Sequence, residues 1–444
     1  MTNGVIIAAP ASGSGKTTVT LALLRHLRTA GVRVGGAKIG PDYIDPAFHT
    51  AACGRPCFNI DSWAMRPATL ARVVARLGQG TDLVIAEGVM GLFDGAPDGA
   101  GSSADVARAT GWPVVLVVDA GGMAASAAAL IHGFASYQPD LSLAGVIFNR
   151  VGSAGHAALL AEACADLGLA ILGALPKDEA LRLPDRHLGL VQAAEHPDLE
   201  AFLDRAASQV AQHLDTDQLM TIARPATLTQ PADDDASTAP LPPLGQRIAV
   251  ARDQAFAFCY PLLLEAWRGA GAEIMPFSPL VGEAPDRDAD AVYLPGGYPE
   301  LHAGRLAGNG RFRDGLRQAA ARGCTVYGEC GGFMVLGRSL TDADGKAHAM
   351  AGLLPVDTSF AAPRLSLGYR QAQLDVSTPL GARGSVFRGH EFHFARIEAA
   401  DDGPVLFRCR DARGRDLGPR GMAAGTVAGS FVHLIDRDAP GESG

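Results

Sequence analysis

The fold of the N-terminal half is decided by one stretch, Val5-Ile6-Ile7-Ala8-Ala9-Pro10-Ala11-Ser12-Gly13-Ser14-Gly15-Lys16-Thr17-Thr18. An apolar strand runs into a glycine-containing loop and an amphipathic helix follows, which is the context that a nucleotide phosphate loop requires. The two glycines let backbone N–H groups approach phosphate oxygens, and the N-terminus of the helix favours negative charge. Pro10 stands where the strict pattern has glycine, so the start of the loop departs from the standard form.

This loop predicts an ATP site. Lys16 is expected to reach the terminal phosphates, and the Thr17 hydroxyl is expected to bind Mg²⁺. Asn149 follows a predicted strand over 144–148 and is interpreted as a contact to the adenine edge, with a plain turn residue as the alternative. The candidate ATP-binding residues are Gly13, Ser14, Gly15, Lys16, Thr17, Thr18 and Asn149.

Two acidic segments are candidates for the metal ion that accompanies ATP. Glu87 ends an apolar strand and is followed by a glycine-rich loop containing Asp94, whereas Asp42 and Asp45 lie in the stiff loop Lys38 to Pro46. Mg²⁺ in nucleotide sites takes one or two carboxylates together with phosphate oxygens and water. The predicted magnesium ligands are therefore Thr17, Asp45 and Glu87. For Asp42 and Asp45 the alternative is a cap or a turn.

Length and composition predict two globular domains. The chain has 444 residues, 48% of them hydrophobic and 19% charged, which exceeds what one core usually organises and argues against disorder. Short β-branched runs alternate with Ala- and Leu-rich helical stretches in both halves, as in parallel α/β sheets. A polar, proline-bearing segment separates them. The predicted division is a synthetase domain over 1–214, a linker over 215–245 and a second α/β domain over 246–440.

The same composition excludes several classes of protein. A net charge of −9 removes the basic footprint of a nucleic-acid binder. Neither a basic n-region nor about 18 consecutive apolar residues is found, so we expect a cytoplasmic protein without membrane contact. Seven cysteines in a chain of this size indicate reduced thiols. Cys53 and Cys57 lack a second pair at metal-ligand spacing and are interpreted as small buried apolar residues.

The C-terminal half contains a candidate nucleophile, Cys330. Thr325 to Leu336 reads as a β-branched strand, a sharp glycine turn that carries Cys330, and a helix, which is the pattern of a nucleophile elbow. The helix N-terminus favours the thiolate. His433, in a β-like run near the end of the chain, is the candidate base. Gly297 and Gly331 are candidates for oxyanion contacts from backbone N–H groups. His390 and His393 are rival histidines, but their spacing is not that of a helical zinc motif.

Taken together, the motifs resemble those of the cobyrinic/hydrogenobyrinic acid a,c-diamide synthases over essentially the whole chain. The segments that carry this resemblance are 9–18, 38–46, 87–95, 186–190, 295–301 and 328–332. The resemblance implies a dethiobiotin-synthetase-like domain followed by a class I glutamine amidotransferase domain. It also implies that Asp42, Tyr43, Ile44, Glu87 and Asp94 lie near the corrinoid carboxylates or Mg²⁺.

The reaction that the resemblance implies is ATP- and glutamine-dependent amidation of the a and c acetate carboxylates of hydrogenobyrinic or cobyrinic acid in cobalamin biosynthesis. The expected partners are small molecules, namely the corrinoid acid, ATP and glutamine, and a homodimer is left open. The rivals are cobyric acid synthase, an enzyme that amidates a nickel tetrapyrrole, and a partitioning ATPase. Many class I glutaminases place Glu two residues after the catalytic His, whereas this chain has Ile435 there. The third member of the triad is therefore unassigned.

Overall fold

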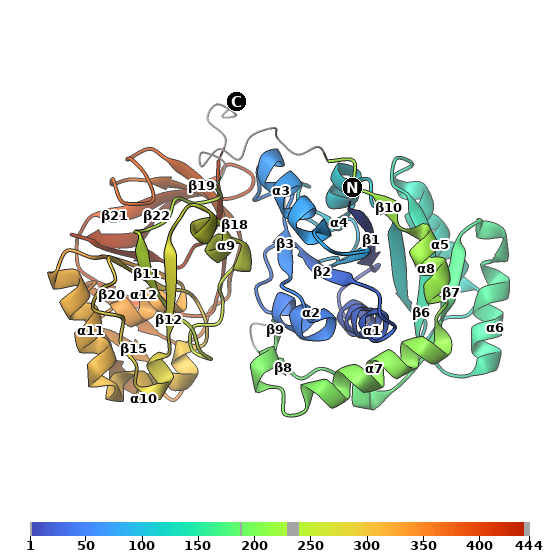
Figure 1. Ribbon diagram of the computed structural model, residues 1–444, viewed down its shortest axis with the longest axis horizontal. Coiled ribbons are helices and arrows are strands. Elements are labelled where there is room, and N and C mark those ends of the chain that lie inside the picture. Colours follow the sequence, from blue (N-terminus) through green and yellow to red (C-terminus); the bar gives the residue numbers. More distant parts are fainter. Residues whose placement is uncertain (1, 187–188, 229–238, 439–444) are drawn as a thin grey trace. The chain divides into compact units, whose positions relative to one another are not determined.

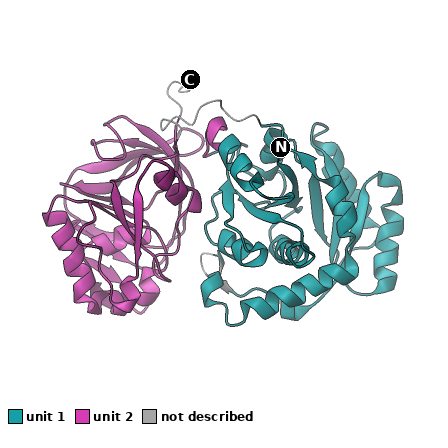
Figure 2. Cartoon of the chain, in the orientation of Figure 1, with its two compact units in different colours: residues 1–63, 70–232 teal, residues 64–69, 233–444 magenta. Residues whose placement is uncertain are grey.

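The computed structural model describes residues 2–186, 189–228 and 239–438. The chain divides into two compact units, coloured separately in Figure 2. The first unit consists of Met1–Trp63 and Leu70–Ala232, and the second consists of Ala64–Thr69 and Asp233–Gly444. Within the described residues no helix is long and apolar enough to cross a membrane. Both halves are α/β, which confirms the predicted fold class.

The first unit is built on an eight-stranded sheet in the order β3-β2-β4-β1-β5-β6-β7, with β10 paired to β1 (Figure 1). Pairing is parallel along this order, and β10 is antiparallel. The strands are β1 (Asn3–Ala8), β2 (Val34–Ile39), β3 (Phe58–Ile60), β4 (Leu83–Glu87), β5 (Val114–Asp119), β6 (Leu143–Val151), β7 (Ala170–Pro176) and β10 (Arg224–Pro225).

The central strands β1, β2 and β4 of this sheet are mainly buried and apolar, with charged residues only near the carboxyl ends of β2 and β4. Val5, Ile6 and Ile7 of β1 have no exposed surface, and β2 and β4 are buried throughout. A parallel sheet covered on both faces requires continuous apolar strands rather than alternating ones. The helices of this unit are α1 (Lys16–Thr29), α2 (Asp45–Cys53), α3 (Pro67–Gly78), α4 (Ser103–Thr110), α5 (Ser126–Tyr137), α6 (Ala154–Ala163), α7 (Leu199–His213) and α8 (Thr216–Ile222).

The segment expected to link the domains, 215–245, contains regular structure at its start. Helix α8 and strand β10 lie within it, and Pro225 pairs with Asn3 of β1. These residues therefore belong to the first unit. Residues 229–238 of the expected linker and residues 187–188 of the 186–190 motif lie outside the described residues; next to the latter, β8 (Asp185–Arg186) pairs with β9 (Gly189–Leu190).

The second unit contains a ten-stranded mixed sheet in the order β12-β11-β13-β14-β23-β22-β21-β18-β19-β24. Its parallel part runs from β12 to β23 and the remainder is antiparallel. The strands are β11 (Arg247–Ala251), β12 (Glu273–Phe277), β13 (Ala291–Leu294), β14 (Thr325–Glu329), β18 (Ser366–Leu374), β19 (Val386–His393), β21 (Val405–Arg410), β22 (Asp416–Ala424), β23 (Val427–Ser430) and β24 (His433–Arg437).

A four-stranded sheet and four helices complete the second unit. The small sheet has the order β16-β15-β17-β20, formed by β15 (Ser339–Thr341), β16 (Ala347–Ala349), β17 (Val356–Ser359) and β20 (Arg396–Ala400). The helices are α9 (Pro261–Gly269), α10 (Ala303–Gly308), α11 (Gly310–Ala321) and α12 (Gly331–Leu336). Helices α9 and α11 and strand β13 belong to the alternation of strands and helices that the sequence pattern predicts for this half. The antiparallel strands between 339 and 424 had no counterpart in that pattern.

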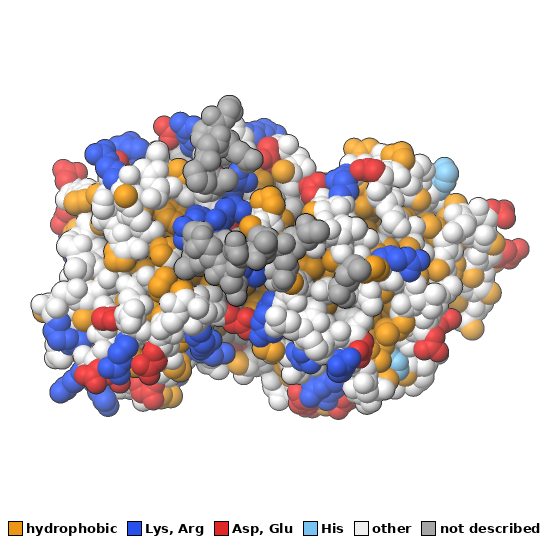
Figure 3. Space-filling model, turned by 45° about the horizontal axis from the view of Figure 1, so that its top comes forward, with side chains coloured by type: hydrophobic (Ala, Val, Ile, Leu, Met, Phe, Trp, Pro, Cys, Tyr) orange, Lys and Arg blue, Asp and Glu red, His pale blue; other side chains and the backbone are white. Residues whose placement is uncertain are grey.

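Charged side chains are mixed on the surface. On the face drawn in Figure 3, Lys and Arg lie in small groups among Asp, Glu and uncharged side chains. This distribution fits the net charge of −9 and differs from the continuous basic field of a nucleic-acid binder.

Candidate active sites

The phosphate loop connects β1 to α1, and its shape depends on two glycines. Gly13 and Gly15 have φ angles of 80° and 90°, in the left-handed region that side chains other than glycine rarely adopt. A Cβ atom on Gly15 would also lie 2.2 Å from Nδ2 of Asn149. Because α1 begins at Lys16, its free N–H groups face the loop that is predicted to hold phosphate.

Lys16 lies at the start of α1 and is 7% exposed. Its Nζ donates a hydrogen bond to the Met90 carbonyl oxygen at 2.6 Å. Burial lowers the pKa of Lys16, while the charge of Glu87 opposes that shift. The loop after β4 thus reaches the phosphate loop. Within it the Asp94 carboxylate accepts the Gly91 N–H at 2.9 Å, so this candidate substrate residue also shapes the loop.

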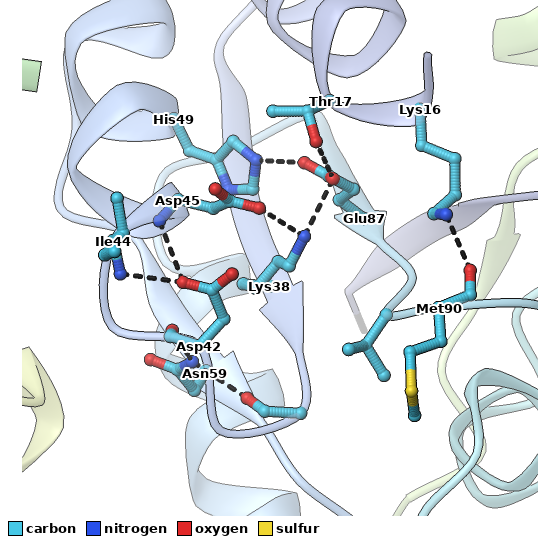
Figure 4. A network of polar contacts seen from close by, with 12 residues as sticks. Lys16, Thr17, Lys38, Asp42, Ile44, Asp45, His49, Asn59, Glu87 and Met90 are labelled. Atoms are coloured by element: carbon cyan, nitrogen blue, oxygen red, sulfur yellow. Dashed lines mark hydrogen bonds and ion pairs between the residues drawn. The ribbon is translucent and has the colours of Figure 1, made fainter. Parts of the chain in front are cut away.

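Figure 4 shows a buried network of charged side chains next to the phosphate loop. Glu87 lies at its centre: Oε1 accepts the Thr17 hydroxyl at 2.6 Å and pairs with Lys38 Nζ at 2.8 Å, and Oε2 contacts His49 Nε2 at 2.6 Å. Lys38 also forms an ion pair with Asp45. The structure therefore brings together the three predicted magnesium ligands, with the Lys38 ammonium between the two carboxylates.

The charges in this network are coupled. Burial by itself would lower the pKa of Lys38, but Asp45 and Glu87 hold it above its usual range. Burial opposes ionisation of Glu87, yet Lys38 and His49 bring its pKa well below the usual value. Burial and the Asp42 carboxylate raise the pKa of Asp45 to about 7. Lys38 and Glu87 are thus held ionised, whereas Asp45 can exchange a proton near neutral pH.

Lys38 and His49 had no predicted role. Parallel pairing of β2 with β4 places Lys38 directly beside Glu87, and α2 brings His49 to the other oxygen of the same carboxylate. The available signal was Lys38 itself, a charged residue at the end of an apolar strand. Such a residue needs a partner once the strand is buried.

The loop before α2 shapes the surroundings of the candidate substrate residues. Asp42 Oδ1 accepts the backbone N–H groups of Ile44 at 2.7 Å and of Asp45 at 3.1 Å, which is the turn role considered as the alternative for Asp42. Tyr43 and Ile44 are each 6% exposed. The structure therefore shows a turn function for Asp42, and contact of these residues with substrate remains a prediction.

Asn149 lies at the end of β6 and contacts the phosphate loop. Its Nδ2 donates to the Ser14 carbonyl oxygen at 2.9 Å. It lines a cavity of about 620 Å³ together with Gly13, Gly15, Lys16, Thr17 and Thr18. A cavity of this size suits a nucleotide. The adenine contact of Asn149 remains a prediction.

In the second unit, Cys330 stands at the turn between β14 and α12. Its φ and ψ angles are 47° and −104°, a strained conformation for a residue with a side chain, and its N–H donates to the Ser430 carbonyl oxygen at 2.8 Å. A Cβ atom on Gly332 would lie 1.9 Å from the Leu294 carbonyl oxygen. The sharp turn thus requires glycine there, as the predicted nucleophile elbow does.

His433 and Cys330 approach the same glycine. A Cβ atom placed on Gly296 would lie 2.4 Å from Cε1 and 3.1 Å from Nε2 of His433, and 3.2 Å from Cβ of Cys330. Residues 330 and 433 are therefore neighbours across Gly296. The two predicted catalytic residues, distant in sequence, are brought together by the pairing of β14 with β23, which precedes β24.

The two predicted oxyanion residues also lie close together. A Cβ atom on Gly331 would be 3.0 Å from the backbone nitrogen of Gly297, and one on Gly297 would be 2.1 Å from the Ala255 carbonyl oxygen. Two backbone N–H groups beside a nucleophile are the usual donors to a tetrahedral oxyanion. The arrangement fits that use and requires glycine at both positions.

The nucleophile and the base are buried and favour their neutral forms. Burial raises the pKa of the Cys330 thiol far above its usual range, and the charge of Glu300 adds to the shift. The pKa of His433 is lowered to about 3, chiefly by burial and to a smaller extent by His390 and His393. His433 is thus unprotonated in this structure.

The rival histidines belong to a packed environment. His390 pairs with His433 across β19 and β24, and His393 stacks on Phe431 with ring centroids 3.9 Å apart. Among the residues that the structure describes, no three His, Cys, Asp or Glu side chains form a group that could hold a metal ion by themselves. Cys53 and Cys57 are both buried, with Sγ atoms 3.5 Å apart.

Together, the fold and the two sites define a two-domain enzyme in which a nucleotide-binding unit accompanies a glutamine amidotransferase unit. Residues 5–191 match the CobQ/CobB/MinD/ParA nucleotide binding domain, and residues 247–440 match the CobB/CobQ-like glutamine amidotransferase domain.

Similar curated proteins span the whole chain. The chain is 56% identical to the hydrogenobyrinate a,c-diamide synthases of Brucella anthropi and Brucella suis biovar 1, with 98% of each chain covered. It is 53% identical to the protein of that name from Rhizobium meliloti, covering 98% of this chain and 99% of the relative. The chain belongs to the family of hydrogenobyrinate a,c-diamide synthases, which confirms the resemblance seen in the sequence.

Proposed function

We propose that the protein amidates the a and c acetate carboxylates of hydrogenobyrinic acid, with ATP as the activating co-substrate and glutamine as the source of nitrogen. The observation that carries this proposal is the presence of both half-sites in one chain: a phosphate loop beside the Lys38–Glu87 network, and a nucleophile elbow beside His433. The names of relatives that match almost the whole chain support hydrogenobyrinic acid as the substrate.

In the first unit the task is to activate a carboxylate, which is a poor electrophile. Transfer of the terminal phosphoryl group of ATP to the carboxylate oxygen gives an acyl phosphate, and ammonia then displaces phosphate to leave the amide. We assign stabilisation of negative charge on the transferring group to Lys16 and the N-terminus of α1, because α1 begins at Lys16 directly after the phosphate loop. Two rounds of this chemistry complete the product.

Thr17 and Glu87 fit a Mg²⁺ ion that accompanies ATP. Both residues offer oxygen ligands, and Thr17 Oγ1 lies 2.6 Å from Glu87 Oε1. Glu87 is held ionised beside the phosphate loop. Asp45 is the third candidate ligand and is paired with Lys38 in this structure. When bound, Mg²⁺ would neutralise charge on the phosphates.

In the second unit the task is to release ammonia. His433 takes the thiol proton of Cys330, and the thiolate attacks the carboxamide carbon of glutamine. The N–H groups of Gly297 and Gly331 stabilise the oxyanion, and protonated His433 returns its proton to the departing ammonia. Water, deprotonated by His433, then hydrolyses the glutamyl thioester to glutamate.

The experiment that tests this function is incubation of the purified protein with ATP, glutamine and one macrocycle at a time. Mass spectrometry should show two successive decreases in the mass of hydrogenobyrinic acid, each equal to the difference between a hydroxyl and an amino group. These decreases should require both ATP and glutamine. Preferred turnover of cobyrinic acid or nickel sirohydrochlorin would reassign the substrate. ATP hydrolysis without any amide product would contradict the proposal.

A further inference from the structure

The position two residues after the base His433 is the one where many class I glutaminases have Glu. In this chain that residue is Ile435, which is apolar and 6% exposed. A general base that carries a proton during turnover gains from a fixed group at its second ring nitrogen, which sets the tautomer and stabilises the imidazolium. The question is which side chain faces Nδ1.

The orientation of the His433 ring is set by its neighbours. Its Cε1 and Nε2 atoms are the ones that face the position of a Cβ on Gly296, on the same side as Cβ of Cys330. Nδ1 lies 3.9 Å from Oε2 of Glu329, the residue immediately before the nucleophile. The imidazole therefore presents Nε2 to the Gly296–Cys330 side and Nδ1 to Glu329.

The Glu329 carboxyl group is held by three donors. Oε2 accepts the Tyr293 hydroxyl at 2.8 Å, and Oε1 accepts the Tyr327 hydroxyl at 3.2 Å and the Leu434 N–H at 3.2 Å. Glu329 is 1% exposed. Burying a carboxyl group is costly, and three hydrogen bonds fix it without saturating its acceptor capacity. The bond to Leu434 ties it to the residue next to His433.

Two other carboxylates of the second unit pair with arginines. Asp436, three residues after His433, is bound by the Arg66 side chain at 2.8 Å and by the Arg66 N–H at 2.8 Å, within the second unit. Glu391 on β19 pairs with Arg370 at 2.6 Å. Glu329 instead has a carboxylate oxygen, Oε2, 3.9 Å from Nδ1 of His433.

We infer that Glu329 is the positioning residue of the glutaminase, so that the triad is Cys330, His433 and Glu329, with the nucleophile and the orienting carboxylate adjacent in sequence. This inference rests on the roles proposed for Cys330 and His433. The thiol proton moves from Sγ to Nε2, and the Nδ1–H donates to Glu329 Oε2, whose negative charge stabilises the imidazolium. The 3.9 Å separation exceeds a hydrogen bond, and we expect it to shorten when glutamine binds, as catalytic contacts commonly do.

The strained turn explains how two consecutive residues reach one ring. Glu329 is the last residue of β14, and the backbone turns sharply at Cys330, with φ at 47°. Successive side chains on a regular strand point to opposite faces, whereas this turn lets them approach the imidazole from two sides. The elbow therefore supplies both the nucleophile and the group that orients its base.

Steady-state kinetics of full-length Glu329→Gln test the inference, because this change removes the charge but keeps the size and one carbonyl oxygen. We expect kcat for glutamine hydrolysis to fall at least about 100-fold while KM for glutamine stays within about threefold. Glu329→Asp should recover part of kcat. Tyr293→Phe, which removes a donor but leaves the charge, is the matched comparison and should lose about tenfold or less. Amide formation from ammonium salt should persist in all three.

Several outcomes would overturn the inference. They are a kcat in Glu329→Gln within threefold of wild type, or equal losses of kcat in Glu329→Gln and Tyr293→Phe. Retention of glutaminase activity by Cys330→Ala would instead overturn the site on which the inference rests. If Glu329→Gln is not recovered folded, ¹⁵N-histidine NMR of the wild type decides, with His433 assigned through His433→Gln. An Nδ1–H tautomer of His433 supports the role of Glu329, and an Nε2–H tautomer excludes it.

Discussion

In the first unit, Lys38 and Glu87 are almost fully buried. They remain ionised because Asp45 and Glu87 surround the Lys38 ammonium, and Lys38 and His49 contact the Glu87 carboxylate. In the second unit, Cys330, His433 and Glu329 are buried to a similar extent, and the pKa of each shifts toward its neutral form. Burial raises the pKa of Glu329 to about 7, lowers that of His433 to about 3 and raises that of Cys330. Similar burial thus leaves Lys38 and Glu87 ionised but favours the neutral forms of Cys330 and His433.

The difference follows from whether opposite charges lie in contact. A buried ion pair offsets the cost of removing two charges from water, whereas an isolated group avoids that cost by becoming neutral. A phosphate site benefits from fixed charges that need no reorganisation when ATP arrives. A thiol site benefits from protons that move only when the substrate is bound. The comparison predicts a synthetase site that is charged at rest and a glutaminase site whose nucleophile and base, Cys330 and His433, are neutral at rest.

Replacing the nucleophile Cys330 should have the largest effect, and it should affect the glutaminase activity of the second unit but not the amide-forming activity of the first. Cys330→Ala should lower product formation from glutamine by about 10⁴-fold or more, since no other group can form the thioester. Product formation from ammonium salt should continue, because the first unit is unchanged. Cys324→Ala, a buried cysteine of the same unit, is the control. Equal loss with both nitrogen sources would contradict the division of labour.

Replacing Lys16 of the phosphate loop should reduce amide formation from both nitrogen sources, glutamine and ammonium salt. Lys16→Ala deletes a cation from the transferring phosphoryl group, and we expect amide formation to fall about 10²- to 10³-fold with glutamine and with ammonium salt alike. Lys177→Ala is the matched control, since Lys177 lines the same cavity but its side chain is 65% exposed. A defect confined to glutamine would show that Lys16 acts elsewhere.

The charged network should be sensitive to loss of its cation. Lys38→Met leaves Asp45 and Glu87 buried without their ammonium, and we expect unfolding of the first unit to become easier by about 3–5 kcal/mol. Urea denaturation followed by circular dichroism measures this. Arg33→Met breaks the exposed pair with Asp82 and should change far less. Comparable losses in the two variants would show that the network is not a buried ion pair in solution.

The stability of the folded protein should decrease in acid because the second unit buries histidines in their neutral form. The pKa of His390 is lowered to about 3, chiefly by burial, from a usual value of 6.5. Below about pH 6.5 the unfolded chain binds a proton that the folded chain does not, so stability falls as the pH decreases toward 3. At about pH 5, His390→Phe should therefore regain about 2 kcal/mol relative to wild type. Denaturation at several pH values checks this. The same gain with His132→Gln, which changes an exposed histidine, would refute the buried-histidine origin.

Contiguous motifs were predictable because their chemistry is local. The phosphate loop needs a strand, two glycines, a lysine and a helix start in direct succession, so Gly13 to Thr17 identified it from sequence. The elbow at Cys330 is equally local. Glu87 and Asp45 were placed near the loop because the carboxyl ends of parallel strands meet at one edge of a sheet.

Partners that depend on strand register were not predictable. Lys38 meets Glu87 because β2 pairs with β4 at that register, and His49 reaches the same carboxylate because of the rotation of α2. The antiparallel strands between 339 and 424 lacked a clear alternating pattern, since β15 and β16 have only three residues each and β20 is exposed along its whole length.

The sequence by itself determined the two chemistries of this protein, since a phosphate loop and a nucleophile elbow each require a fixed order of residues along the chain. The tertiary structure alone decided the charge of the groups in the two sites: contact with Asp45 and Glu87 keeps Lys38 ionised in one unit, and burial favours the neutral form of His433 in the other. Electrostatic interactions depend on distance and burial, and both arise only when strands far apart in sequence are packed into one sheet.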